Sequence, residues 1–237
     1  MPPATDERKK QLLRAVVREY IVSAEPVGSE TVAEKYDFGV SSATIRNDMA
    51  DLEDLGLLVQ PHASAGRVPT ARGYRFYVEE FAMDTELPTR ERRIVRELVG
   101  RLRDDVDWAV REIAKTVAGM TAETVVVRLG DEEPFLTGIS NLSNKPEFRQ
   151  TSLLSEVFRA IDDLDRVVRD ADSRLGGNVQ VFIGEDNLFG GATSSVLAHI
   201  ESPFGKGLIG IVGPQRMDYD ANTALVRALR EALASLE

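Results

Sequence analysis

The sequence contains no cysteine, and its only histidines are His62 and His199. Without thiols, a disulfide framework, a cysteine nucleophile and a zinc or iron–sulfur site built on cysteine are all excluded. The two histidines lie far apart in the chain and in dissimilar settings, which argues against a histidine-rich metal site. We therefore expect neither a metal ion nor a cofactor.

Long apolar runs are also missing. No run approaches the roughly 18 to 20 residues that a membrane helix needs, and the N-terminal segment MPPATDERKK has no apolar signal core. Aromatic residues make up only 6% of the 237 residues, but 43% are hydrophobic, which excludes wholesale disorder. We expect a soluble, cytoplasmic protein with one large or two small domains.

The sequence has fewer basic residues than acidic ones. The chain has 29 Lys and Arg against 39 Asp and Glu, a net charge of −10. This balance argues at first sight against nucleic acid as a partner. A local basic patch can still bind DNA on an acidic chain, so any such face must have its charges segregated.

Apolar spacing and turn residues divide the chain into two parts. In the first part the predicted elements are helices over 6–22, 29–36 (capped by Ser29) and 42–55 (capped by Ser41 or Ser42), a strand over 57–60, a loop over 62–66, a strand over 67–68 and a helix after Thr70. Three helices followed by a small hairpin is the layout of a winged helix-turn-helix. We predict this DNA-binding domain over residues 1–82.

The second part, residues 83–237, is predicted to be an α+β domain with a mostly antiparallel sheet. Its predicted elements are one long amphipathic helix over 90–118, strands over 124–129, 135–139, 179–183, 195–200 and 208–212, and helices near 151–171 and 221–236. The fold class is therefore α+β in both parts.

The segment Val40–Met49 carries the strongest functional signal. Burying Ile45, Met49 and Leu52 on one face turns the opposite face outward, with Ser42, Arg46, Asn47 and Ala50. Arginine pairs with guanine and asparagine with adenine in the major groove. The hydroxyls of Ser41, Ser42 and Thr44, together with the helix N-terminus, suit phosphate oxygens.

Acidic residues gather in the later part of the same helix, namely Asp48, Asp51, Glu53 and Asp54. They would repel phosphate, so we predict that the helix enters the groove by its N-terminal end. The alternative interpretation is an ordinary surface helix with a capped start.

The short loop from His62 to Arg67 supports the DNA-binding interpretation. Its small residues allow close approach to the DNA backbone or the minor groove, where arginine is favoured, and Arg72 and Arg75 follow. The alternative is a plain hairpin turn in which Gly66 supplies a positive φ.

These segments resemble the HrcA family of bacterial heat-inducible transcription repressors. The matching stretches are Ser41–Met49, Leu52–Leu57, Pro61–Thr70 and Gly73–Arg75, followed later by Gly138–Leu142, Pro146–Phe148, Ile183–Asn187 and Gly213–Tyr219. The predicted DNA-binding residues are Ser41, Ser42, Thr44, Arg46, Asn47, His62, Ser64, Arg67 and Arg72, of which Arg46 and Asn47 are predicted to contact bases.

The resemblance implies a repressor that binds an inverted-repeat operator, called CIRCE, upstream of chaperone genes. It also implies a homodimer, a GAF-like C-terminal domain and help from the chaperonin GroEL. Family chains usually carry a dimerising insertion, whereas here residues 129–135 form a short acidic turn. We expect a shortened GAF-like domain, with the helix over 90–118 either replacing the dimer interface or packing on its own domain.

The motifs that resemble those of enzymes lack the sequence context that their chemistry needs. Gly205–Gly210 matches G-x-G-x-x-G but runs into a strand and opens no helix, as a dinucleotide loop must. We expect Arg216 and Asp218 to fix a turn, His199 to be structural, and the protein not to be an enzyme. Two alternatives remain: a small-molecule-responsive regulator, and a protein-interaction or enzymatic module that no longer binds DNA.

Overall fold

The computed structural model describes residues 6–130 and 132–236 of the chain. The chain divides into two compact units between Ala82 and Met83. Within the described ranges, no helix is long and apolar enough to cross a membrane. Both helices and sheets are present, so the predicted mixed class is confirmed.

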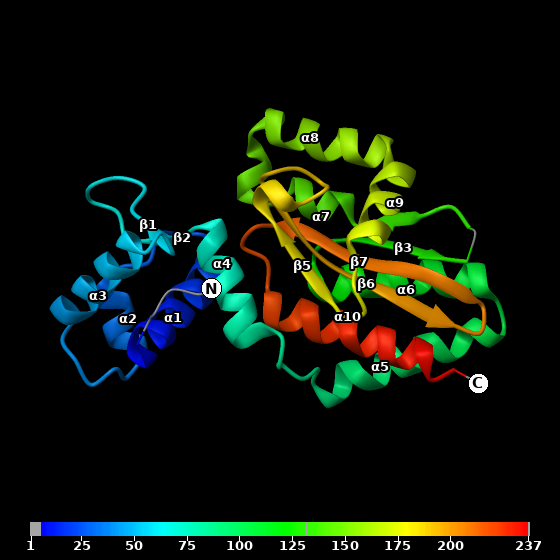
Figure 1. The fold of residues 1–237 in the computed structure, drawn as a ribbon, viewed down its shortest axis with the longest axis horizontal. Helices are drawn as coiled ribbons and strands as arrows, with labels where there is room; N and C mark the ends of the chain where they lie inside the picture. The colour runs from blue at the N-terminus through cyan, green and yellow to red at the C-terminus, as the bar shows by residue number, and fades with distance from the viewer. Residues whose placement is uncertain (1–5, 131, 237) are drawn as a thin grey trace. The chain divides into compact units, whose positions relative to one another are not determined.

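The N-terminal unit is built from helices and one small hairpin (Figure 1). Its elements are α1 (Glu7–Ser23), α2 (Ser29–Lys35), α3 (Ser42–Asp54), β1 (Leu58–Val59), β2 (Val68–Pro69), α4 (Ala71–Tyr77) and a π-helical turn (Val78–Ala82). Asp6 caps α1, Ser41 caps α3 and Thr70 caps α4 with their side chains. The predicted cap Ser29 is instead the first residue of α2, and Gly28 holds the capping position.

The hairpin is short, with two residue pairs joining β1 and β2. Val59 lies opposite Val68 in an antiparallel register, and an isolated bridge joins Val27 to Arg67. Gly66 does not have the positive φ expected of it. A Cβ at Gly66 would lie 2.4 Å from the carbonyl oxygen of Val27, so the glycine is needed for close approach of two backbones.

The C-terminal unit begins with two helices where the periodicity predicted one. The helix α5 (Thr89–Gly100) continues into a 3₁₀ turn (Arg101–Arg103), and α6 (Val106–Thr121) then begins afresh. The break is set by Asp105, whose carboxylate accepts a hydrogen bond from the amide of Trp108 at 2.9 Å and caps α6. The apolar stripe continues across the break, which is why spacing alone predicted a single helix.

Much of that stripe is buried within the chain itself. Of the predicted stripe, Leu102, Ala109, Ile113 and Val117 are at most 2% exposed, as are the neighbouring Val95 and Val99. Ile94, Leu98 and Val106 are half-buried. Of the two alternatives for residues 90–118, the structure supports packing on the helix's own domain.

The sheet of this unit has five strands in the order β4-β3-β7-β6-β5, each pair antiparallel as predicted. The strands are β3 (Thr124–Leu129), β4 (Phe135–Thr137), β5 (Gln180–Ile183), β6 (Thr193–Ser202) and β7 (Gly205–Pro214). The short turn between β3 and β4 contains Asp131, which lies outside the described residues.

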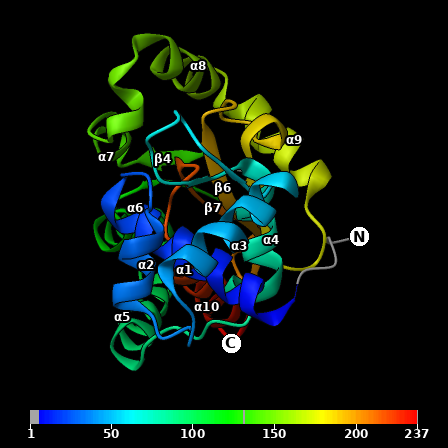
Figure 2. The same ribbon diagram turned by 90° about the vertical axis from the view of Figure 1, so that its left-hand side faces the viewer.

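Helices cover both faces of the sheet (Figures 1 and 2). The helices α8 (Thr151–Asp162) and α9 (Leu164–Arg174) pack against a core that includes Val126, Leu197 and Leu208. On the opposite face, α6 contacts β3 while α10 (Tyr219–Ala234) contacts β6. The helix predicted over 151–171 is therefore two helices, separated at Asp163. A short helix, α7 (Ile139–Ser143), and 3₁₀ turns at Pro146–Arg149 and Gly184–Asp186 complete the unit.

Candidate nucleic-acid interface

The third helix separates apolar and polar residues as its spacing predicts. Ile45, Met49 and Leu52 are buried, whereas Arg46 and Asn47 are exposed. Ser42 and Ala50 are half-buried beside them. Among the described residues, Arg46 has neither a hydrogen bond nor an ion pair, so its guanidinium is free to bind a ligand.

The beginning of α3 has a well-defined cap. The hydroxyl of Ser41 accepts a hydrogen bond from the amide of Thr44 at 3.2 Å and lies 3.1 Å from the Thr44 hydroxyl. The amides of residues 42 and 43 belong to the first turn and have no intrahelical acceptor. With the helix dipole, these groups make this end suitable for an anion.

The acidic later part of α3 is largely neutralised by cations of the same unit. Arg8 of α1 binds both carboxylate oxygens of Asp48 at 2.8 and 3.1 Å, and Asp48 is only 5% exposed. The ammonium of Lys9 lies 2.9 Å from Asp51. These hydrogen bonds raise the pKa of Arg8 and that of Lys9 above their ordinary values. Two of the four carboxylates that were expected to repel phosphate therefore have counter-ions within the same unit.

A third acid of the cluster holds the hairpin. Glu53 accepts a hydrogen bond from the amide of Gln60 at 3.0 Å and pairs with Arg67 at 2.9 Å. The Arg67 side chain is only 14% exposed. Its guanidinium therefore anchors the hairpin to α3, and its contact with DNA stays a prediction.

The loop between the hairpin strands is organised by Gln60, a residue that sequence reasoning missed. Its side-chain amide donates to the carbonyls of Ala63 and Ala65 at 3.2 and 2.8 Å. This arrangement leaves His62 and Ser64 exposed, with the Ser64 hydroxyl 3.3 Å from Nδ1 of His62. The only sequence feature that could have indicated this role of Gln60 is the position of its amide side chain just before a loop of small residues.

A cleft of about 450 Å³ brings part of the predicted site together. It is lined by residues from the start of α2, from α3 and from the loop, among them Ser29, Thr31, Arg46, Gln60, Ser64 and Arg67. Arg72 lies elsewhere. It is exposed on α4, and its Nη1 would lie 3.5 Å from a Cβ placed at Gly56, directly after the C-terminal end of α3.

The enzyme-like motif in the C-terminal unit has a packing explanation. Gly205–Gly210 lies within strand β7. A Cβ at Gly207 would lie 2.0 Å from the carbonyl oxygen of Arg128, and one at Gly210 would lie 2.3 Å from a Leu197 methyl group. The glycines therefore permit strand packing and form no phosphate-binding loop.

Other residues of this unit also have structural partners. Asp218 caps α10, accepting a hydrogen bond from the amide of Ala221 at 3.0 Å. Arg216 forms an ion pair with Glu147. Nδ1 of His199 lies 3.6 Å from a carboxylate oxygen of Asp172. Within the described residues, no group of three or more His, Cys, Asp or Glu is arranged to hold a metal ion.

Sequence reasoning also missed a buried carboxylate beside Gly213, near the end of β7. The side chain of Glu123 is 4% exposed and pairs with Lys145 at 2.9 Å. Burial raises the pKa of Glu123 to about 7, even though Lys145 and Arg216 act to lower it. A single glutamate at the end of a helix gives no sequence signal of such burial.

These features define a two-unit α+β protein in which a helix-and-hairpin unit precedes a helix-flanked antiparallel sheet. The family model described as HrcA protein C terminal domain matches residues 75–222. The chain belongs to the HrcA family.

Curated relatives support this assignment. A heat-inducible transcription repressor HrcA of Clostridium perfringens (strain SM101 / Type A) is 46% identical over 124 residues, which is 52% of this chain and 37% of that protein. The protein of the same name from Desulforudis audaxviator (strain MP104C) is 61% identical over 90 residues, covering 38% of this chain and 26% of that protein. The aligned residues thus span well under half of these relatives' lengths.

A solved structure shares the fold. The crystal structure of a hypothetical protein superimposes with a TM-score of 0.73 at 20% sequence identity, covering 98% of both chains. At this identity the likeness concerns the fold alone.

Proposed function

We propose that this chain is a sequence-specific DNA-binding repressor of heat-shock genes, and that residues 1–82 form a winged helix-turn-helix. The observation that carries the proposal is the asymmetry of α3. Among the described residues, Arg46 and Asn47 in its exposed N-terminal half have no ion pair or hydrogen-bonded side chain, whereas Asp48, Asp51 and Glu53 in its later half pair with cations of the same unit. The names of the relatives supply the regulatory context.

In this proposal α3 is the recognition helix. Arg46 donates a bidentate pair of hydrogen bonds to guanine, and Asn47 pairs with adenine, in the major groove. Ser41, Ser42 and Thr44 contact phosphates at the helix N-terminus. The loop with His62 and Ser64 contacts the DNA backbone as the wing, and Arg72 contributes a separate phosphate contact. Arg67 supports the loop through Glu53.

We further propose that two subunits bind an inverted repeat of the CIRCE type. A two-fold symmetric dimer places its two recognition helices in successive major grooves, so half-site spacing follows from the dimer. The chaperonin GroEL remains a predicted partner.

Fluorescence-anisotropy titration of the full chain tests this function. The probes are a duplex with the inverted repeat, a duplex with one half-site and a scrambled duplex of equal composition. We expect the inverted repeat to bind at least about 10³-fold more tightly than the scrambled duplex, and the half-site to bind without the cooperativity of the full site. Equal, weak binding to all three duplexes would contradict sequence-specific repression.

A further inference from the structure

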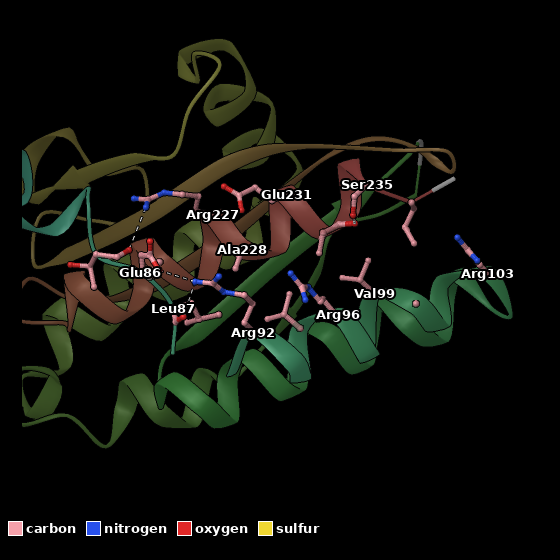
Figure 3. Close-up of a pocket in the computed structure, with 16 residues that line it drawn as sticks. Glu86, Leu87, Arg92, Arg96, Val99, Arg103, Arg227, Ala228, Glu231 and Ser235 are labelled. Atoms are coloured by element: carbon pink, nitrogen blue, oxygen red, sulfur yellow. Dashed lines mark hydrogen bonds and ion pairs between the residues drawn. The ribbon is translucent and has the colours of Figure 1, made fainter. Parts of the chain in front are cut away.

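The C-terminal unit carries a groove that the proposed DNA contacts do not use. It runs between α5 and α10 and has a volume of about 670 Å³ (Figure 3). Its floor is apolar: Val95, Val99 and Ala224 are at most 3% exposed. Further along α10, Ala228 and Ala232 are half-buried. Because alanines recur every fourth residue, the α10 wall leaves a shallow channel for the side chains of another helix.

Arginines dominate the charged lining of this groove. Arg92, Arg96, Arg103 and Arg227 stand against two carboxylates, Glu86 and Glu231. This is an excess of positive charge on a chain whose net charge is −10. Figure 3 shows Arg92 and Arg96 directed from α5 toward α10, with Arg103 at the far end of the groove.

Two of the four guanidiniums already have partners within the chain. Arg92 binds the Glu86 carboxylate and the Leu87 carbonyl, each at 3.2 Å. Arg227 donates to the carbonyls of Met83 and Thr85. The contact with Glu86 shows that a carboxylate fits beside this wall of the groove.

The other two guanidiniums have no such partner. Among the described residues, neither Arg96 nor Arg103 forms a hydrogen bond or an ion pair, and both are exposed. Arg96 lies in α5 and Arg103 ends the 3₁₀ turn that follows it, seven residues further along, so the two lie roughly 10 to 12 Å apart along the helical path. Two open cations at this spacing, beside an apolar floor, are complementary to two carboxylates two turns apart on an amphipathic helix.

We propose that the groove between α5 and α10 binds an acidic amphipathic helix of a partner protein. The apolar face of that helix packs on Ala228 and Ala232, which are half-buried, and its carboxylates pair with Arg96 and Arg103. Glu231 lines the α10 side of the groove, so the acidic edge of the partner faces α5. A compact anion would satisfy only one arginine and leave the apolar floor uncovered.

The test uses the full chain and a fluorescein-labelled helical peptide of about 18 residues, roughly 27 Å long. The peptide consists of Ala, Leu and Gln, with two Glu residues seven positions apart. Two comparison peptides carry Gln at both Glu positions, or carry the two Glu residues two positions apart. We expect saturable binding of the first peptide at concentrations below about 1 mM and at least about tenfold weaker binding of the other two.

The variants distinguish the groove from general charge attraction. Arg96→Gln combined with Arg103→Gln should weaken binding about tenfold or more. Arg93→Gln is the matched control because Arg93 lies on α5, is exposed and does not line the groove. It should bind like the unmodified chain. Circular dichroism checks that each variant is folded, which is expected because the substituted side chains are exposed.

Four outcomes would overturn the proposal. These are no binding of the first peptide, equal binding of the Gln peptide, an equal loss in Arg93→Gln, or competition by inorganic tripolyphosphate with no contribution from the peptide's apolar residues. The operator titration is separate and uses other residues, so failure of peptide binding and failure of DNA binding are distinguishable.

Discussion

Arg46 and Arg67 line the same cleft and have the same side chain, but their surroundings give them different roles. Arg67 is held by Glu53 at 2.9 Å and is mostly buried. Arg46 lines the same cleft, is exposed and has no hydrogen bond or ion pair among the described residues. A guanidinium already paired with a carboxylate gains little by exchanging it for a phosphate, so Arg46 is the cation of this cleft that is available to DNA.

Substitution of Arg46 separates base recognition from charge. Arg46→Ala should weaken binding to the inverted repeat by about 1 to 3 kcal/mol and relax specificity at one base position. Arg46→Lys keeps the charge but loses the bidentate geometry, so it should lose specific affinity while retaining affinity for the scrambled duplex. Anisotropy titration on both duplexes measures these effects. Equal weakening on both duplexes by Arg46→Ala would argue against base recognition.

The buried Glu123 makes stability depend on pH. Its pKa is raised from 4.5 to about 7, so between these values the folded chain holds a proton that the unfolded chain releases. The free energy of unfolding therefore falls as pH rises from 4.5 to 7, by up to about 3 kcal/mol for this group. Glu123→Gln should remove this contribution, which chemical denaturation at pH 5 and pH 8 would measure.

The matched control is Glu97→Gln. Glu97 is 68% exposed on α5, so its substitution should leave the difference between the two pH values unchanged. An unchanged pH dependence in Glu123→Gln would show that the buried carboxylate is not the responsible group.

Among the secondary-structure elements, α1 acts as a counter-ion for α3. Arg8 and Lys9 neutralise Asp48 and Asp51, but only Asp48 is buried. Arg8→Ala leaves a carboxylate in a largely desolvated position, whereas Lys9→Ala leaves one that water can reach.

We therefore expect unequal effects from these neighbouring substitutions. Both substitutions should lower the urea midpoint of unfolding. The decrease caused by Arg8→Ala should be at least about three times the decrease caused by Lys9→Ala. Equilibrium denaturation of the three proteins provides the comparison. Equal midpoints for the two variants would mean that burial of Asp48 contributes nothing to the pair.

The packing of strand β7 against β3 requires glycine at position 207. A Cβ at Gly207 meets a backbone carbonyl oxygen of β3 at 2.0 Å, and backbone does not move aside easily. Gly207→Ala should destabilise the protein by about 2 kcal/mol or more. Gly119→Ala on the exposed side of α6, where a Cβ meets nothing within 4 Å, should be neutral or stabilising by up to about 1 kcal/mol. Thermal melts of both variants test the contrast.

Helices and strands with strong periodicity were predictable from sequence. The apolar spacing of α3 and α10 and the valine-rich run of β3 placed these elements to within a few residues. The break between α5 and α6 was not predictable, because the apolar stripe continues through it and only the capping role of Asp105 marks it. The division of residues 151–171 into two helices at Asp163 was not predicted either, because apolar residues recur at helical spacing on both sides of it.

The candidate site was predictable in position but not in its pairing. The outward face of α3 follows from its helical period, so the exposure of Arg46 and Asn47 could be anticipated. Which arginine is free depends on contacts across 14 residues, from Glu53 to Arg67, and across 40 residues, from Arg8 to Asp48. Residue spacing contains no information on such long-range pairs.

For the whole molecule, the charge balance constrains how DNA binding responds to salt. The net charge is −10, five of the ten Lys and Arg of residues 6–82 form ion pairs within the chain, and Arg18 donates a hydrogen bond to Tyr77. Only two or three cations per subunit are then available to phosphates, so log Kd should change with log salt by a magnitude of about 2 to 3 per subunit. Anisotropy titrations over a salt series measure this slope. A slope twice as steep or more would place the DNA on a different, more basic surface.

The intramolecular counter-ions of α3 also limit how this helix can be reused. Transplanting residues 42–54 into another scaffold would carry Asp48, Asp51 and Glu53 without Arg8, Lys9 and Arg67. The graft would present three uncompensated carboxylates to the phosphates on either side of the groove. In protein engineering, the transferable unit is therefore α1, α3 and the hairpin together, and mutations that retarget the specificity of α3 must preserve its partners.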